Sequence, residues 1–319
     1  MNKQLIEKHY ELQVSDLTPL DSHFGTEILR ADTSVGKYIV KVLPLYVEDV
    51  DNEGFITEYL YNHGLKVARL LKSKAGAYVV KMKDFQFTIQ EYIEGETLAI
   101  NTAPQWFMEQ SAEYLGKAVA LLKDYRQLPI RFGKDFFLTE TADNKRLLYE
   151  KELMAAIKAG TQKVIPIWEE QIRHLKKIAA FDINTDQLTY ANSHGDYYIG
   201  QAIVKNNDIT VIDWTSACCL PICLDIMISY VFASPTCAEG AIDAEGLKKY
   251  IGMYSKYFTI TEYDIKAMPY VFYFWQCICN YRPDELATIA QSYQLIAKLI
   301  YSVLNWLRDH VEELAEELS

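Results

Sequence analysis

The spacing of hydrophobic residues changes near residue 100, and this change restricts the folds open to the chain. Before it, short β-branched or aromatic segments bounded by turn residues predict strands at 37–44, 78–84 and 87–93. Between the first two, residues 53–64 carry apolar side chains at helical spacing and stop at Gly64. From about Pro104 the spacing predicts helices at 104–125, 163–180, 244–257, 261–280 and 283 to about 310, with a strand-like interruption at 188–213. Thr261, with Asp264 three positions later, is a predicted helix N-cap. A small β-rich lobe followed by a large helical lobe predicts an α+β fold, and nucleotides often bind between such lobes.

The composition is that of a globular protein with a substantial core. The 319 residues are 50% hydrophobic and 24% charged. The net charge of −11 gives no electrostatic footprint for nucleic acid or for anionic lipid. An acidic surface is compatible with a cationic substrate, although acidity is also a common means of staying in solution. The longest uncharged stretch, 267–281, is too short to span a bilayer, and the N-terminal sequence lacks the apolar run of a signal peptide.

The six cysteines lie in apolar sequence surroundings, as in CCLPIC and WQCIC. No pair of C-x-x-C elements is present, so the sequence does not predict a structural zinc site. Buried, reduced thiols are the expected state, and they are typical of a cytoplasmic protein.

Residues 194–214 contain the groups that phosphoryl transfer to an alcohol requires. These are an acceptor for the hydroxyl proton, oxygen ligands for Mg²⁺ and a cation for the nucleotide phosphates. Asp196 is predicted on a loop, Gln201 adds an amide oxygen, and Asp213 follows a predicted strand. A loop–strand–turn–strand path predicts that both carboxylates lie at one end of a hairpin.

The segment HGDYYIGQ, followed by a strand ending in IDW, resembles the sequence motif of the aminoglycoside phosphotransferase-like kinases. That superfamily includes aminoglycoside, choline, homoserine and methylthioribose kinases. The resemblance continues to Pro221 and Asp225, where the family places a proline and a structural aspartate. It implies a bilobal protein-kinase-like fold, with residues 1–93 as the nucleotide-binding lobe and 94–319 as the catalytic and substrate-binding helical lobe.

The resemblance also assigns roles to residues of the motif. It implies that Asp196 is the catalytic base, that Asp213 is the principal Mg²⁺ ligand and that Asp225 braces the loop. The family usually has asparagine where this chain has Gln201, which keeps the amide oxygen but adds a methylene. We therefore expect Gln201 to bind a second metal more weakly, and we expect His194 to brace the loop rather than carry a proton.

In the first lobe, the resemblance places Lys41 on the α- and β-phosphates of ATP. A helix glutamate should orient it, and Glu53 stands at the spacing before Gly64 that the family tends to show. Glu58 remains the alternative partner for Lys41.

Two further segments are predicted to contact the nucleotide. The turn over the phosphates is predicted to include Ser22, Gly25 and Thr26, although a turn with one glycine is a weak signal by itself. The hinge that binds adenine through main-chain groups is predicted at Gln90, Glu91, Tyr92 and Ile93.

These features predict an ATP- and Mg²⁺-dependent kinase that moves the γ-phosphate to a hydroxyl of a small molecule. The alternative is a catalytically weak nucleotide-binding pseudokinase or a structural protein that resembles the spore-coat members of the superfamily, and Gln201 is the residue in its favour. A protein kinase is disfavoured because no D-F-G, A-P-E or activation segment follows.

The acceptor is not determined by the sequence. Aromatic residues crowd one predicted helix and its end: Tyr270, Tyr273, Phe274, Trp275 and Tyr281. They could form a box for a quaternary ammonium, but aromatic residues on a buried helix more often belong to the core. Asp284 and Glu285 could meet an amine, or they could be favourable first-turn charges of a helix.

Overall fold

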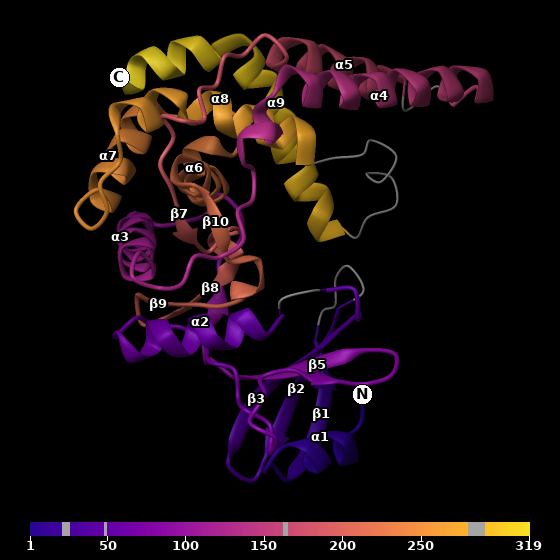
Figure 1. The fold of residues 1–319 in the computed structure, drawn as a ribbon, viewed down its shortest axis with the longest axis vertical. Helices are drawn as coiled ribbons and strands as arrows, with labels where there is room; N and C mark the ends of the chain where they lie inside the picture. The colour runs from indigo at the N-terminus through magenta and orange to yellow at the C-terminus, as the bar shows by residue number, and fades with distance from the viewer. Residues whose placement is uncertain (21–25, 48–49, 162–164, 280–290) are drawn as a thin grey trace. The chain divides into compact units, whose positions relative to one another are not determined.

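The computed structural model describes residues 1–319 except 21–25, 48–49, 162–164 and 280–290, and it leaves the side chains of 291–294 undescribed (Figure 1).

The chain divides into two compact units that are not contiguous in sequence. The first unit is Met1–Leu98 with Gly200–Ala217, and the second is Ala99–Ile199 with Cys218–Ser319. This division differs from the predicted lobes 1–93 and 94–319. The reason is that residues 200–217 form backbone hydrogen bonds with residues of the first unit that are far away in the sequence.

The first unit is built on a five-stranded antiparallel sheet with the order β1-β2-β3-β5-β4. Its strands are β1 (Val14–Pro19), β2 (Glu27–Thr33), β3 (Gly36–Leu43), β4 (Val80–Lys81) and β5 (Gln86–Glu91). Two helices accompany it, α1 (Lys3–His9) and α2 (Val50–Asn62). The strands and the helix predicted between them are therefore present.

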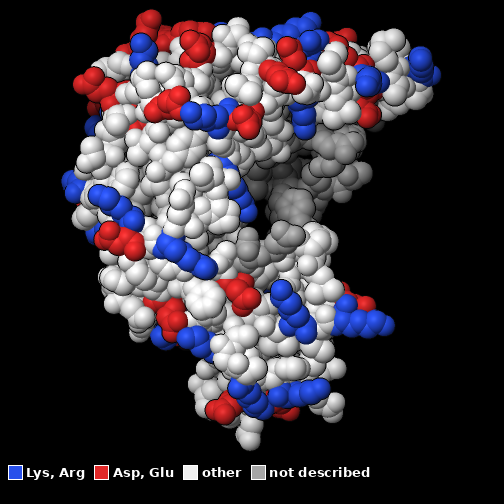
Figure 2. Space-filling model, viewed as in Figure 1, with Lys and Arg blue, Asp and Glu red and all other residues white. Residues whose placement is uncertain are grey.

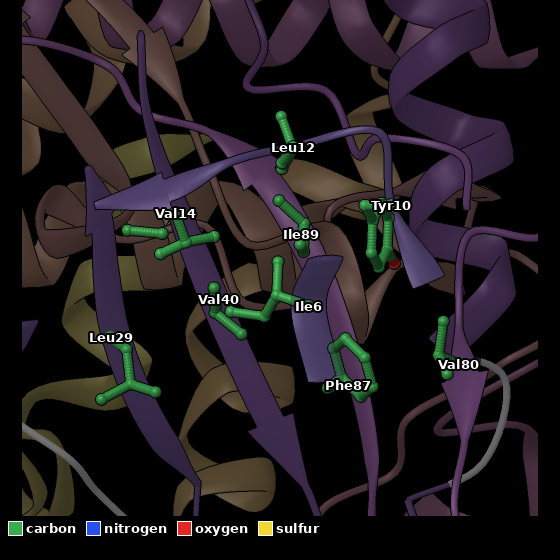
Figure 3. Packing of buried hydrophobic residues seen from close by; sticks show 10 residues of the cluster. Ile6, Tyr10, Leu12, Val14, Leu29, Val40, Val80, Phe87 and Ile89 are labelled. Atoms are coloured by element: carbon green, nitrogen blue, oxygen red, sulfur yellow. The ribbon is translucent and has the colours of Figure 1, made fainter. Parts of the chain in front are cut away.

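One face of this sheet carries the core of the first unit. Ile6 and Tyr10, at α1, pack there against Val40 of β3 and against Phe87 and Ile89 of β5 (Figure 3). Successive side chains of a strand point to opposite faces of the sheet. The residues before and after Val40 in the sequence, Ile39 and Lys41, therefore point to the other face. Lys41 is therefore directed away from this core.

A second, three-stranded sheet belongs to the first unit and contains β6 (Glu96–Thr97), β8 (Ala202–Lys205) and β9 (Asp208–Val211). Asn206 and Asn207 connect β8 to β9 with φ angles of 54° and 57°, as a tight hairpin turn requires. The Val211 N–H donates to the Lys66 carbonyl at 3.2 Å, and the Ala68 N–H donates to the Val211 carbonyl at 3.2 Å. These bonds hold the hairpin in the first unit.

The second unit is mainly helical. Its helices are α3 (Gln105–Leu122), α4 (Thr139–Ala159), α5 (Ile165–Ile178), α6 (Ile222–Ala233), α7 (Ala244–Tyr254), α8 (Glu262–Cys279) and α9 (Gln291–Leu318). A two-stranded sheet pairs β7 (Tyr190–Ser193) with β10 (Cys218–Pro221). Every residue of α6 is buried, so this helix lies at the centre of the unit (Figure 1).

Local signals located several of these helices. Thr261 and Asp264 form a reciprocal capping pair before α8, with each backbone N–H bonded to the other side chain at 3.1 and 3.0 Å. The α+β class is confirmed by the antiparallel sheet of the first unit and the helices of the second. Helices α1, α4 and α6 were not predicted. A wholly buried helix such as α6 has no polar face, so its sequence does not show the alternation of polar and apolar residues that marks a helix.

Acidic and basic side chains are interspersed on the face shown in Figure 2. Among the described helices, none combines the length and the apolar character needed to cross a membrane.

Candidate active site

Lys41 forms the centre of a charged cluster in the first unit. Its Nζ lies 3.1 Å from Glu53 Oε1 of α2 and 3.0 Å from Asp213 Oδ1. The Glu53 side chain is fully buried and that of Lys41 nearly so. The alternative partner, Glu58, bonds instead to Lys72 at 3.1 Å and to the hydroxyl of Tyr78.

Asp213 follows β9 and has a left-handed backbone, with φ 61° and ψ 59°. A non-glycine residue in this region is uncommon, and such backbones concentrate at functional sites. The turn allows Thr215 to reach both carboxylates of the cluster. Its Oγ1 lies 2.8 Å from Asp213 Oδ1 and 3.1 Å from Glu53 Oε2, so its single hydroxyl proton is shared between the two carboxylates.

The cluster keeps Lys41 charged. Burial by itself lowers the pKa of Lys41, but the carboxylates of Asp213 and Glu53 outweigh burial and leave the pKa raised. Burial raises the pKa of Glu53, and Lys41 and Thr215 oppose that effect. The result is a fixed ammonium with a defined direction, which is the kind of group that binds phosphate oxygens as a point charge.

Gln201 lies beside Asp213 at the end of the β8–β9 hairpin. The Ile212 N–H donates to the Gln201 main-chain carbonyl at 2.9 Å, so Gln201 stands across from the residue before Asp213. Among the described residues, no group of three or more His, Cys, Asp or Glu side chains is arranged to hold a metal ion. A site with one carboxylate and one amide fits Mg²⁺, which is commonly bound by one or two carboxylates together with substrate phosphates and water.

The predicted hinge lies at the end of β5. Gln90 is buried, and its amide donates to the Ala68 carbonyl at 3.3 Å. Glu91 is held by Arg69, whose Nε lies 3.1 Å from Glu91 Oε1. Beyond the strand, Gly95 has φ +147°, and a Cβ there would come within 2.4 Å of the Val204 carbonyl, so only glycine fits.

Of the remaining residues predicted to contact the nucleotide, some are described and others are not. Tyr92 and Ile93 follow β5 directly, and the Tyr92 ring lies 5.6 Å from the ammonium of Lys37. Thr26 immediately precedes β2. Ser22 and Gly25 fall within 21–25 and so lie outside the described residues.

In the second unit, residues 194–198 form the segment that we call the Asp196 loop, between β7 and the 3₁₀ turn Ile199–Gln201. Asp196 is partly exposed there. Asp225 of α6 is buried, accepts a hydrogen bond from the Ser193 hydroxyl and accepts another from the Gly195 N–H at 3.3 Å. Burial raises the pKa of Asp225, and the bonds from the loop oppose that shift. Asp225 therefore contacts the loop as a brace would.

The aromatic residues of α8 divide between core and partly exposed positions. Tyr273 and Phe274 are fully buried, and the Tyr273 hydroxyl bonds to His174 Nδ1 at 2.6 Å. Tyr270 packs edge-on against Phe181. The core interpretation therefore holds for the buried pair. Tyr281, Asp284 and Glu285 lie outside the described residues.

Thr215 is a member of the charged cluster that sequence reasoning missed. The only local signal was a hydroxyl residue two positions after the aspartate, which is weak without knowledge of the left-handed turn at Asp213. A separate cavity of about 300 Å³ lies in the second unit, beside Met108, Tyr230, Asp243, Lys249 and Tyr250, and no predicted site residue lines it.

Solved structures similar in fold to this chain include two kinases and a phosphotransferase of small molecules. An amicoumacin kinase in complex with AMP-PNP, Ca²⁺ and amicoumacin is 16% identical, with a TM-score of 0.63 over 96% of this chain and 94% of that one. A spectinomycin phosphotransferase in complex with ADP and spectinomycin is 15% identical, with a TM-score of 0.61 over 99% of this chain and 97% of that one. A microcompartment-associated aminopropanol kinase is 14% identical, with a TM-score of 0.59 over 99% of this chain and 98% of that one.

These likenesses confirm the protein-kinase-like fold predicted from the sequence. No curated protein matches the chain by sequence. Residues 16–257, which include every described residue of the charged cluster and the Asp196 loop, match the sequence pattern of one family. The chain belongs to the phosphotransferase enzyme family.

Proposed function

We propose that this protein is an ATP- and Mg²⁺-dependent kinase that transfers the γ-phosphate of ATP to a hydroxyl group of a small molecule. The observation that carries the proposal is the cluster of Lys41, Glu53 and Asp213, which joins a strand, a helix and a hairpin end within one unit. A structural ion pair would not require a third charged group on a left-handed turn. Solved structures of similar proteins contain AMP-PNP or ADP, which supports a nucleotide as the donor.

In this proposal, the first unit binds the nucleotide. Lys41 binds the α- and β-phosphates, and Glu53 fixes the direction of its ammonium. Asp213 and Gln201 would hold Mg²⁺, which supplies charge neutralisation on the phosphates when bound. The hinge at Gln90–Ile93 would bind the base through main-chain groups, because the Glu91 side chain is already held by Arg69.

Asp196 is proposed to accept the proton of the attacking hydroxyl. An ordinary carboxylate is a weak base for an alcohol. In phosphoryl transfer this matters little, because the loose transition state requires little proton removal before the phosphorus–oxygen bond forms. The main contribution of Asp196 is then to orient the hydroxyl in line with the γ-phosphate.

The acceptor is proposed to be a small hydroxylated molecule, and the names of similar proteins, an amicoumacin kinase, a spectinomycin phosphotransferase and an aminopropanol kinase, support a small molecule. The net charge of −11 is compatible with a cationic acceptor. A thermal-shift screen of hydroxylated metabolites and antibiotics with ATP and Mg²⁺ would identify it, since a ligand that binds the native state raises the melting temperature.

The test of nucleotide binding is calorimetry with ATP, with and without Mg²⁺. We expect Mg²⁺-dependent binding that Asp213→Ala abolishes. The matched control is Asp208→Ala, which changes an exposed aspartate at the start of β9 and should leave binding unchanged. Absence of binding at millimolar ATP with Mg²⁺ would contradict the proposed nucleotide site.

The test of catalysis is Asp196→Asn, which keeps the size of the side chain but removes its charge. We expect ATP affinity to stay within about twofold while turnover falls by roughly 10²–10⁴-fold, as for general bases elsewhere. Asp124→Asn, at an exposed position after α3, is the control. Loss of ATP binding in Asp196→Asn would show that this residue is structural or binds metal.

The second candidate is a protein that binds nucleotide without transfer, and Gln201 is the observation in its favour. If a broad acceptor screen yields no phosphorylated product while Mg²⁺-dependent ATP binding is intact, this second function replaces the first.

A further inference from the structure

Four buried hydroxyl groups meet next to the Asp196 loop in the second unit. They belong to Ser111 of α3, Tyr197 of the loop, Ser229 of α6 and Tyr250 of α7, and we call them the hydroxyl cluster. Each of the four side chains is at most 2% exposed. Such a group of polar atoms is stable in a core only if its members bond to one another.

Ser111 is the centre of the hydroxyl cluster. Its Oγ donates to Tyr197 Oη at 3.1 Å and lies 3.0 Å from Tyr250 Oη and 3.3 Å from Ser229 Oγ. Ser229 and Tyr250 also bond to each other. The cluster therefore connects three helices of the core to one residue of the loop.

The hydroxyl cluster is uncharged at neutral pH. Burial raises the pKa of Tyr250 to about 12, and burial raises the pKa of Tyr197 further. Both phenols therefore keep their protons and act as hydrogen-bonding groups, and neither is a proton carrier.

The loop is thus fixed on both sides of Asp196. On one side the Gly195 N–H bonds to Asp225, and on the other the Tyr197 hydroxyl bonds to Ser111. Asp225 and Ser229 are four residues apart on α6 and so lie on the same face of that helix. The Tyr197 ring is further enclosed, with ring centroids 5.9 Å from Tyr114 and 5.6 Å from His194.

We propose that the hydroxyl cluster positions Asp196 for phosphoryl transfer by fixing the side chain of the next residue, Tyr197. Ser111, Ser229 and Tyr250 are then positioning residues, which act on the reaction only through the loop. This inference rests on the proposed function, in which Asp196 orients the acceptor hydroxyl. Orientation of that kind is sensitive to displacements of about 1 Å, so a small shift of the loop is enough to slow transfer.

The first test is amide hydrogen exchange in the full-length protein carrying Tyr197→Phe or Tyr250→Phe. Each variant removes one hydroxyl and keeps the ring. Loss of the bond should raise exchange at residues 193–199 by about five- to tenfold, because the loop opens locally more often. Exchange in β3 of the first unit should not change.

Two tyrosines of the same core provide matched controls. The Tyr230 ring lies 5.6 Å from that of Tyr250, and its hydroxyl donates to the Asp243 carbonyl at 3.1 Å, outside the hydroxyl cluster. Tyr254 is buried one turn after Tyr250, and its hydroxyl has no partner among the residues that the structure describes. Tyr230→Phe and Tyr254→Phe should leave loop exchange as in the parent protein. Equal exchange changes in Tyr230→Phe and Tyr250→Phe would overturn the inference.

The second test separates positioning from general stability through kinetics. With the acceptor found by screening, Tyr197→Phe and Tyr250→Phe should lower kcat about five- to tenfold and leave KM for ATP unchanged, because the nucleotide groups lie in the other unit. The double variant should lose little more than either single variant, since both hydroxyls act through Ser111. A looser loop with unchanged kcat would show that the cluster serves the fold alone and would overturn the positioning role.

Failure of the proposed function gives a different result. If the parent protein binds ATP but phosphorylates no acceptor, Asp196 has no catalytic role. The hydroxyl cluster then has no positioning role either. If Asp196→Asn lowers turnover while the tyrosine variants change neither loop exchange nor kcat, the proposed function stands and this inference alone is wrong.

Discussion

The two units hold their candidate site residues by different physical means. In the first unit, Lys41, Glu53 and Asp213 are held by opposite charges at 3.0–3.1 Å. In the second unit, the loop around Asp196 is held by one buried carboxylate and by neutral hydroxyl groups. Removing one member of a buried charged group leaves an uncompensated charge, whereas removing one hydroxyl leaves a smaller defect. The first unit should therefore tolerate substitution at its site far less well than the second.

The largest effect is expected for Lys41→Met, which leaves Glu53 buried without its cation. We expect the free energy of unfolding to fall by about 3–5 kcal/mol in urea denaturation, because a broken buried ion pair costs that much. The double variant Lys41→Met with Glu53→Gln should recover part of this loss, since it removes the buried charge as well.

The matched control is Lys205→Met in the same unit. Lys205 pairs with Glu94 at 2.7 Å, but both side chains are exposed, so the loss should stay below about 1 kcal/mol. Equal effects at Lys41 and Lys205 would show that the charged cluster does not stabilise the first unit.

The second unit should be the more sensitive of the two to acid, because His174 is buried in it. Burial lowers the pKa of His174 from 6.5 to about 4. The charged groups that face it are Glu170 and Arg173 on its own helix α5 and Arg308 on α9. The polar partners are Tyr273 on α8 and Asn305 on α9.

The unfolded chain binds a proton at His174 near pH 6.5, whereas the folded chain does so only near pH 4. Stability is therefore lost as the pH falls from about 6.5 to about 4, by roughly 3 kcal/mol at this residue. Urea denaturation between pH 7 and pH 4.5 should show a weaker pH dependence for His174→Gln than for the parent protein. His63→Gln, at an exposed position after α2, should keep the parent dependence. A steeper dependence in His174→Gln would contradict this prediction.

The smallest effect is expected for Thr215→Val, which removes the hydroxyl shared by Glu53 and Asp213. The one hydroxyl proton, shared between two carboxylates at a half-buried position, should contribute about 1–2 kcal/mol to the free energy of unfolding. The control Thr210→Val lies on β9, where valine suits a strand, and it should have no cost. Thermal melting of both variants measures the difference, and a Thr215→Val protein as stable as Thr210→Val would show that this hydroxyl does not hold the cluster.

The sequence predicted those parts of the fold and site that depend on local patterns. Strand and helix periods located β3 and α2. The family resemblance favoured Glu53 over Glu58 as the partner of Lys41, and the contact between Lys41 and Glu53 is present. The capping pair at Thr261 marked the start of α8 because its two residues are three positions apart.

Features that depend on distant pairing were not predictable. Ser111 and Tyr250 are 139 residues apart, and single serines or tyrosines in helices carry no sign of what they meet. The assignment of residues 200–217 to the first unit likewise depends on bonds between Val211 and residues 66–68. The local spacing of hydrophobic residues does not indicate such a pairing.

The discontinuous first unit has a consequence for synthesis on the ribosome. Domains generally fold as units while the chain emerges from its N-terminus. Here the first 98 residues must wait until residues 200–217 have emerged, because β8 and β9 complete the sheet with β6 and supply Asp213 to Lys41. During that interval the edge of β6 is unpaired, and Lys41 has Glu53 but not Asp213 as a partner. An unpaired strand edge invites aggregation. A gene fragment ending at Leu98 should therefore give an insoluble product, even though it encodes most of the unit that we propose binds the nucleotide.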